Sequence, residues 1–113
     1  MKEEVFDIAI VGGGIVGSAT FYQLQKAFPT KKLVLIEKEP KLAHHQTGNN
    51  SGVIHSGLYY TPGSKKAENC VNGRHELVKF AKEHGISHDI CGKVVVATSS
   101  SEISNLEKIL DNG

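Results

Sequence analysis

The pattern of apolar and polar positions predicts a strand, a helix and a second strand over the first third of this chain. Residues 5–11 (VFDIAIV) are mostly apolar and β-branched, which is typical of a strand buried on both faces. From Ile15 to Phe28 apolar residues recur at roughly helical spacing until Pro29, and residues 33–36 (LVLI) form a second apolar run. With a glycine turn after the first strand, these elements make a βαβ unit, which implies a parallel pair with a right-handed crossover.

The second half of the chain predicts two more helices and a third strand. Ser64 is placed as the N-cap of a helix with apolar residues at i, i+3, i+4 and i+7, and Gly85 ends that helix. Residues 93–98 (KVVVAT) have the composition of a strand. Ser99–Ser101 can cap a last helix over residues 102–110. Three strands and three helices do not complete a doubly wound sheet, so we interpret the chain as the N-terminal piece of a longer protein.

Residues 44–60 (HHQTGNNSGVIHSGLYY) fit neither pattern. They are too rich in glycine for a helix and too irregular in apolar spacing for a strand, which predicts a loop loaded with polar groups. His44 and His45 are adjacent and do not have the spacing of metal ligands, so we expect no metal site and a solvated start to the loop.

Composition and charge narrow the classes of function. The 113 residues suffice for one small domain, and 13 basic against 12 acidic residues give no large positive field, so we expect no nucleic-acid partner. The N-terminal apolar run is too short for a signal peptide or a membrane span. Cys70 and Cys91 are far apart in sequence and are typical of reduced thiols, which favours the cytoplasm.

A glycine motif follows the first predicted strand. Gly12, Gly14 and Gly17 form G-x-G-x-x-G, and Glu37 lies 20 residues beyond Gly17 at the end of the second strand. The first glycine permits a tight turn, the second lets a pyrophosphate approach the backbone, and the third lets the helix pack closely on the strand. Free N–H groups at the helix N-terminus attract phosphate, and a carboxylate at Glu37 suits ribose hydroxyls. The motif therefore predicts a dinucleotide, and the carboxylate argues against the 2′-phosphate of NADP.

FAD and NAD use the same turn, and the loop after the second strand favours FAD. An NAD domain would continue soon into another helix and parallel strand, whereas this chain continues into the Gly, Asn, Ser and His loop. Small residues, amide side chains and backbone N–H groups suit a bulky flavin ring. We therefore predict FAD as the cofactor, bound by Gly12, Gly14, Ile15, Val16, Gly17, Glu37, Lys38, Gly48, Asn50, Ser51, Gly52 and Val53.

Four quoted segments carry a resemblance to a known family. DIAIVGGGIVG, LIEKE, HQTGNNSGVIHSGLYYTPGSKKA and ICGKVVVATS together are similar to the FAD-dependent L-2-hydroxyglutarate dehydrogenases and oxidases of the D-amino-acid-oxidase-like superfamily. The resemblance implies an α/β fold with a Rossmann-like FAD-binding βαβ unit, followed by the start of an α+β substrate domain. Residues 1–85 would be the N-terminal part of the FAD domain, and residues 86–113 the beginning of the substrate domain. One departure is Asn49-Asn50, where family members often have His-Asn.

The resemblance also implies a reaction. L-2-hydroxyglutarate would be oxidised to 2-oxoglutarate, with a hydride passing from C2 to flavin N5 while a base takes the hydroxyl proton. The substrate is then a small 2-hydroxy acid, and electrons would pass to oxygen or to a membrane quinone. The parent protein would be cytoplasmic, or peripheral at the inner membrane.

Two residues have competing interpretations. His55, in the middle of the loop, is either the catalytic base beside the flavin or a histidine that hydrogen-bonds the cofactor or a backbone carbonyl. Arg74 interrupts the apolar stripe of residues 67–81, and a buried arginine requires a partner. That partner is either a carboxylate of the protein or a dianionic substrate.

Three alternatives remain open for the whole chain. It is the N-terminal portion of the oxidoreductase described above, a portion of a related flavoenzyme such as a glycerol-3-phosphate or amino-acid oxidase, or a truncated and inactive chain. On any of these interpretations we expect the 113 residues alone to be inactive. We also expect them to self-associate, because apolar stripes would otherwise face water.

Overall fold

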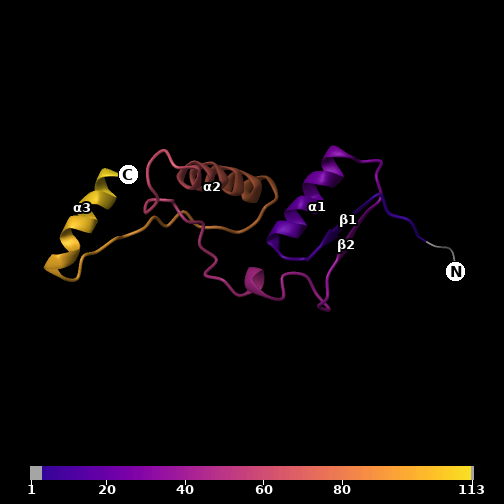
Figure 1. The fold of residues 1–113 in the computed structure, drawn as a ribbon, viewed down its shortest axis with the longest axis horizontal. Helices are drawn as coiled ribbons and strands as arrows, with labels where there is room; N and C mark the ends of the chain where they lie inside the picture. Colours follow the sequence, from indigo (N-terminus) through magenta and orange to yellow (C-terminus); the bar gives the residue numbers. More distant parts are fainter. Residues whose placement is uncertain (1–3, 113) are drawn as a thin grey trace. The chain divides into compact units, whose positions relative to one another are not determined.

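A computed structural model describes residues 4–112 of the protein. The chain divides into two compact units, one extending to Gly52 and the other beginning at Val53 (Figure 1). This division concerns the 113 residues alone, and the domain boundary predicted at residue 86 for a longer protein stays a prediction.

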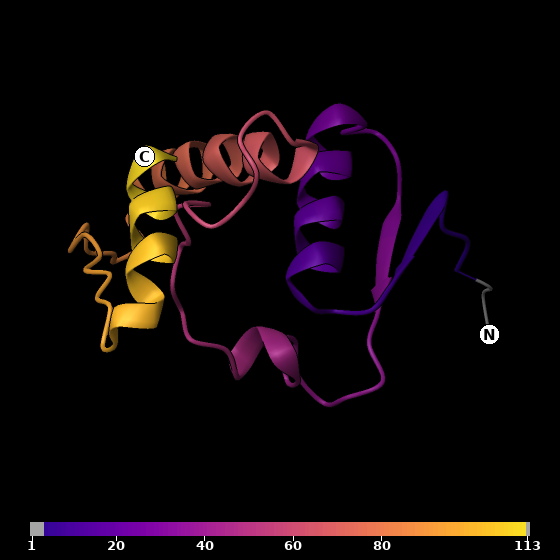
Figure 2. The ribbon, with the colours of Figure 1, turned by 60° about the vertical axis from the view of Figure 1, so that its left-hand side comes forward.

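The first unit contains the predicted βαβ arrangement. Strand β1 (Ile8–Val11) is followed by helix α1 (Ile15–Ala27) and strand β2 (Leu33–Ile36). The two strands pair in parallel, with Ile8 opposite Leu33 and Val11 opposite Ile36. Helix α1 lies beside the strand pair in both ribbon views (Figures 1 and 2). The prediction of a mixed α/β unit with a parallel pair is therefore confirmed.

The first strand is not buried on both faces, contrary to the expectation. Ile8 and Ile10 are half-buried, whereas Ala9 and Val11 are exposed, with Val11 81% exposed. The reason is that a two-stranded sheet with one helix against it has cover on one face only, so alternate residues face outward.

Polar contacts of Asp7 join the chain just before β1 to the chain just before β2. The carboxylate of Asp7 accepts hydrogen bonds from the Lys32 backbone N–H at 2.8 Å and from Lys31 Nζ at 3.0 Å. The Lys32 N–H is the larger cause that lowers the pKa of Asp7, and the ammonium of Lys31 adds to it. These contacts fix where β2 begins relative to β1, which sets the register at the opposite end, where the glycine turn lies.

The second unit is built around helix α2 (Lys65–Glu83). Ser64 is its N-cap, as predicted, and the Ser64 hydroxyl accepts a hydrogen bond from the Ala67 N–H at 3.2 Å. At the other end Gly85 adopts a positive φ of 64°, and the N–H of Ile86 donates to the Ala81 carbonyl at 2.8 Å. This is the Schellman pattern that a glycine after a helix permits. A short 3₁₀ turn, η2 (Ser100–Glu102), leads into the last helix, α3 (Ile103–Asp111).

The third predicted strand is wrong. Residues 93–98 run as irregular chain between α2 and η2 in both ribbon views (Figures 1 and 2). Strand composition alone does not make a strand, because a strand exists only when its backbone pairs with a neighbour. Within residues 4–112, β1 and β2 are paired only with each other, and they belong to the other unit.

The described residues have little core. Among residues 4–112, Ala81 is the one hydrophobic residue that is buried, with 4% of its surface exposed. None of the helices in that range is both long enough and apolar enough to cross a bilayer.

Candidate functional site

The glycine turn joins β1 to α1 with the close approaches that its motif predicts. Gly12 has a φ of +101°, which favours glycine, and its N–H donates to the Ile36 carbonyl at 2.8 Å. A Cβ on Gly17 would collide with the carbonyl oxygen of Gly12. The third glycine therefore lets α1 start directly against the turn.

The N-terminus of α1 offers backbone donors to a ligand. Gly14 is the N-cap and has no side chain that could cap the helix. The N–H groups of Val16 and Gly17, in the first turn, have no carbonyl four residues earlier within the helix. Such N–H groups, together with the helix dipole, favour an anion such as phosphate.

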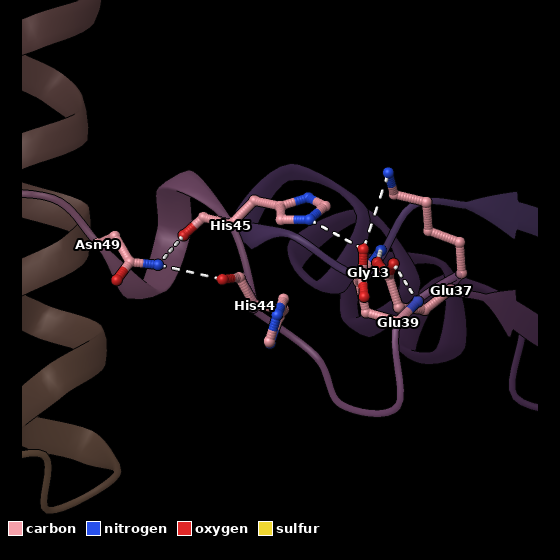
Figure 3. Close-up of polar contacts among 7 residues, drawn as sticks. Gly13, Glu37, Glu39, His44, His45 and Asn49 are labelled. Atoms are coloured by element: carbon pink, nitrogen blue, oxygen red, sulfur yellow. Dashed lines mark hydrogen bonds and ion pairs between the residues drawn. The ribbon is translucent and has the colours of Figure 1, made fainter.

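Glu37, directly after β2, is tied to the glycine turn (Figure 3). Its Oε2 accepts a hydrogen bond from the Gly13 N–H at 2.6 Å, and its Oε1 accepts one from the Glu39 N–H at 3.0 Å. The Glu39 N–H, and then the Gly13 N–H, lower the pKa of this carboxyl below its ordinary value. Glu37 is therefore held as a carboxylate, and each oxygen keeps capacity to accept from a hydroxyl group.

The start of the loop returns to the same turn. The Ala43 N–H donates to the Gly13 carbonyl at 3.0 Å, and the Ile15 N–H donates to the Thr47 hydroxyl at 2.9 Å. Thr47 belongs to a short 3₁₀ turn, η1 (Gln46–Gly48), and a Cβ on Gly14 would lie 3.2 Å from its Oγ1. The sequence interpretation did not include Thr47 among the binding residues. A threonine in a Gly/Asn loop is the only signal that could have pointed to it.

These segments line an open cavity of about 480 Å³. The size falls in the range of small-molecule sites, about 300–1,000 Å³. Its lining comes from the turn, the end of β2 and the loop: Val11, Gly12, Gly14, Ile36, Glu37, Lys38, Ala43, His44, His45, Gln46 and Thr47. A Cβ at Gly14 would approach Thr47 of this loop, so the glycine lets the loop lie close to the turn.

The predicted binding residues do not all meet at this cavity. Gly12, Gly14, Glu37 and Lys38 line it. Ile15, Val16 and Gly17 form the helix start beside it. Gly48, Asn50, Ser51 and Gly52 lie further along the loop in the same unit, and Val53 begins the second unit.

Asparagine side chains hold the loop in shape. Asn49 Nδ2 donates to the carbonyls of His44 and His45, at 3.0 and 2.7 Å (Figure 3). Asn50 Nδ2 donates to the carbonyl of Thr47 at 2.7 Å, and its Oδ1 accepts from the Gly52 N–H at 2.7 Å. The Asn49-Asn50 departure from the family pattern therefore has a local structural role.

The rings of the adjacent residues His44 and His45 lie with their centroids 5.5 Å apart. His45 Nε2 lies 3.0 Å from Glu39 Oε1, while its side chain stays 57% exposed. Among residues 4–112, no cluster of His, Cys, Asp or Glu side chains could hold a metal ion.

His55 lies in the second unit and is anchored through its backbone. Its carbonyl accepts a hydrogen bond from the Cys70 thiol of α2 at 3.4 Å. Two residues later Gly57 has a φ of +82°, and a Cβ there would lie 3.2 Å from Cys70 Sγ. His55 itself is exposed, and its imidazole makes no hydrogen bond or ion pair within residues 4–112. The backbone of His55 is thus fixed against α2, while its imidazole is exposed.

Comparisons with known proteins show the family of this chain. Residues 7–113 match the family described as FAD dependent oxidoreductase. The chain is 54% identical over 108 residues to an L-2-hydroxyglutarate dehydrogenase of Indibacter alkaliphilus, covering 96% of this chain and 27% of that protein. It is 47% identical to the L-2-hydroxyglutarate dehydrogenase of Escherichia coli strain K12, over 93% of this chain and 25% of that one. For the mitochondrial L-2-hydroxyglutarate dehydrogenase of Homo sapiens the identity is 49%, over 96% and 23%. The chain therefore spans about a quarter of the length of these relatives.

Proposed function

Because this chain belongs to the family of FAD dependent oxidoreductases, we propose that it supplies the dinucleotide-binding part of an L-2-hydroxyglutarate dehydrogenase or oxidase. The observation that carries the proposal is the cavity bounded by the glycine turn and Glu37. Backbone N–H groups at the start of α1 would bind the pyrophosphate of FAD, and the Glu37 carboxylate would accept hydrogen bonds from the adenosine ribose.

The residues present fit FAD. The start of α1 presents the N–H groups of Val16 and Gly17, while the Ile15 N–H is bonded to the Thr47 hydroxyl, and the carboxylate of Glu37 beside it is held ionised. Lys38 lines the same cavity and would contribute a positive charge toward the phosphates. The further loop residues Ser51 and Gly52 are small and exposed, which suits a close approach of the flavin.

The proposed reaction is the oxidation of L-2-hydroxyglutarate to 2-oxoglutarate. FAD, held by the glycine turn and Glu37, would supply the hydride acceptor for this oxidation at C2 of the substrate. In the same step the hydroxyl group loses its proton and the C2–O bond becomes a carbonyl. His55 is the group of this chain that we assign to take that proton, because its imidazole is exposed and makes no hydrogen bond or ion pair within residues 4–112.

The rest of the enzyme is also a proposal. Residues 86–113 would begin the α+β substrate domain, and electrons would leave through oxygen or a membrane quinone. The location predicted from the sequence is the cytoplasm or, for the full-length parent, the periphery of the inner membrane. Relatives include a bacterial protein of Escherichia coli and proteins named as mitochondrial, so location varies within this group.

Titration of the purified chain with FAD and with ADP tests the cofactor part. We expect saturable binding of both, followed by flavin fluorescence and by calorimetry for ADP. Glu37→Gln is expected to weaken both ligands roughly tenfold, the scale of one charge-assisted hydrogen bond. Glu76→Gln, an exposed position on α2, is the matched control and should bind normally. Failure of both ligands to bind in a folded sample would overturn the assignment of this cavity.

A chimera tests the reaction. The corresponding N-terminal quarter of the Escherichia coli relative is replaced by this chain, and oxidation of L-2-hydroxyglutarate is measured with a dye acceptor. We expect a yellow, active protein whose rate falls in a His55→Asn variant, with FAD content unchanged. A folded, FAD-loaded chimera that does not oxidise this substrate would contradict the proposed reaction.

A further inference from the structure

A second cavity, of about 520 Å³, lies within the second unit. One wall comes from α2, with Ala67, Val71 and Arg74, and another from residues 56–63, including Tyr60. Asn72 and Asn112 add amide groups to the lining. The cavity therefore combines apolar surface with a few polar groups, which is the usual composition of a small-molecule site.

Arg74 is the unusual member of this lining. It is half-buried on the same helical stripe as Ala67 and Val71, and no carboxylate lies within 4.0 Å of it in residues 4–112. Arg74 Nη2 lies 3.4 Å from Nε2 of His75, the next residue in the chain. An arginine presents five donors in a fork that matches a carboxylate. Most of that capacity is unused here.

The charges around the cavity favour an anion. Lys66 Nζ lies 4.3 Å from the ring centre of Tyr60, and Tyr60 lines the cavity. The one acidic residue of the lining, Glu68, is already paired with Lys65 Nζ at 2.8 Å. With Glu68 paired, Arg74 and Lys66 make the net charge near the cavity positive.

We propose that Arg74 and the cavity beside it bind a carboxylate of a short dicarboxylic acid. The guanidinium would hold the carboxylate through two parallel N–H donors, the amides of Asn72 and Asn112 would supply further hydrogen bonds, and the apolar wall would contact the methylene chain. This inference rests on the proposed function, to which it adds a residue that selects a dicarboxylic acid over a monocarboxylic one.

The test uses the 113-residue chain and glutarate as the probe. Nitrogen-edited NMR spectra follow the Arg74 side chain and the amides of Asn72 and Asn112 during titration. We expect saturable shifts at these groups with glutarate, and weaker binding with butyrate, which has the same chain type and one carboxylate fewer. Arg74→Met should weaken glutarate binding roughly tenfold to a hundredfold, the loss of a charge-assisted pair.

Lys79→Met is the matched control. Lys79 lies on α2, carries the same charge and contacts Glu83 at 3.8 Å outside the cavity. Equal loss in both variants would mean general charge attraction and would overturn the proposal. Absence of saturable glutarate binding to the unmodified, folded chain would also overturn it. FAD and ADP binding is measured in the same samples. A failure of the cofactor assignment is thereby distinguished from a failure of the carboxylate site at Arg74.

Discussion

The glycines of the turn differ in what a side chain would meet. A Cβ on Gly17 meets the carbonyl oxygen of Gly12, which is backbone and cannot move aside without distorting the turn. A Cβ on Gly14 meets Thr47 Oγ1 at 3.2 Å, a side chain that can shift slightly. A substitution at Gly17 therefore tests the folding of the turn, whereas a substitution at Gly14 tests the access of the cofactor to it.

We predict that Gly14→Ala lowers FAD affinity while the circular dichroism spectrum stays unchanged, because the new methyl group stands where the pyrophosphate approaches. Gly17→Ala is predicted to lower both FAD affinity and the midpoint of chemical denaturation. Gly73→Ala, on α2 with nothing within 4 Å, should bind FAD normally and stabilise its helix by about 0.5–1 kcal/mol. Normal FAD affinity in Gly14→Ala would remove the turn from the binding site.

Glu37 makes the stability of the first unit depend on pH. Its pKa in the folded chain is lowered from 4.5 by the N–H groups of Glu39 and Gly13. A lowered folded pKa means that the carboxylate contributes stability above its unfolded pKa, and that this contribution is lost as the pH falls through the folded value. The loss therefore lies below about pH 4.5.

We predict that stability measured by urea denaturation falls less steeply below that pH in Glu37→Gln than in the unmodified chain. The comparison between the two proteins is needed because the pKa values of Asp7 and Glu102 are lowered as well. Parallel pH profiles would show that the Gly13 and Glu39 contacts do not hold the carboxylate in solution.

At the scale of elements, α2 carries the clearest local signals. Its start depends on the Ser64 hydroxyl, which accepts from the Ala67 N–H. We predict that Ser64→Ala destabilises the second unit by about 1 kcal/mol, the usual cost of losing an N-cap. Ser104→Ala, an exposed position on α3, should change stability by a few tenths of a kcal/mol at most. Helix content followed by circular dichroism during heating distinguishes the two variants.

Elements whose signals are local were predictable from the sequence. The bounds of β2 were read correctly, α1 ended one residue before the predicted Phe28, and Ser64 and Gly85 marked the ends of α2. The strand at 93–98 was predicted from composition and was wrong, because pairing depends on a partner elsewhere in the chain. The strand preference of residues 93–98 does not say whether another strand lies beside them to pair with.

The residues of the candidate site also include some that the sequence predicted and some that it did not. The spacing of Gly12, Gly14 and Gly17 before a helix, with Glu37 after the second strand, located the turn and its carboxylate. Thr47 could not be found, because its contact with the Ile15 N–H joins residues 32 positions apart through the path of the loop. That path depends on side-chain bonds such as those of Asn49 and Asn50, for which no periodicity exists.

At the scale of the whole chain, large apolar side chains lie uncovered in both units. Val11 and Val16 are exposed in the first unit, and Val94, Val96 and Leu110 in the second, with Val94 86% and Val96 70% exposed. Residues 93–97 also form no backbone hydrogen bonds with another segment in the part of the chain described. Unpaired backbone beside β-branched side chains is suited to strand addition.

We therefore predict that the isolated chain self-associates and binds FAD weakly. Light scattering over a dilution series should show a mass above that of a 12.2 kDa monomer, falling as the protein is diluted. Val96→Lys places a charge in the exposed segment and should shift the series toward monomer, because pairing would bury that charge. Asn105→Lys adds the same charge at an exposed polar position of α3 and should leave the mass unchanged. A compact monomer at every concentration, with tightly held FAD, would contradict the prediction and would mean that this quarter of the relatives' length is enough to hold the cofactor.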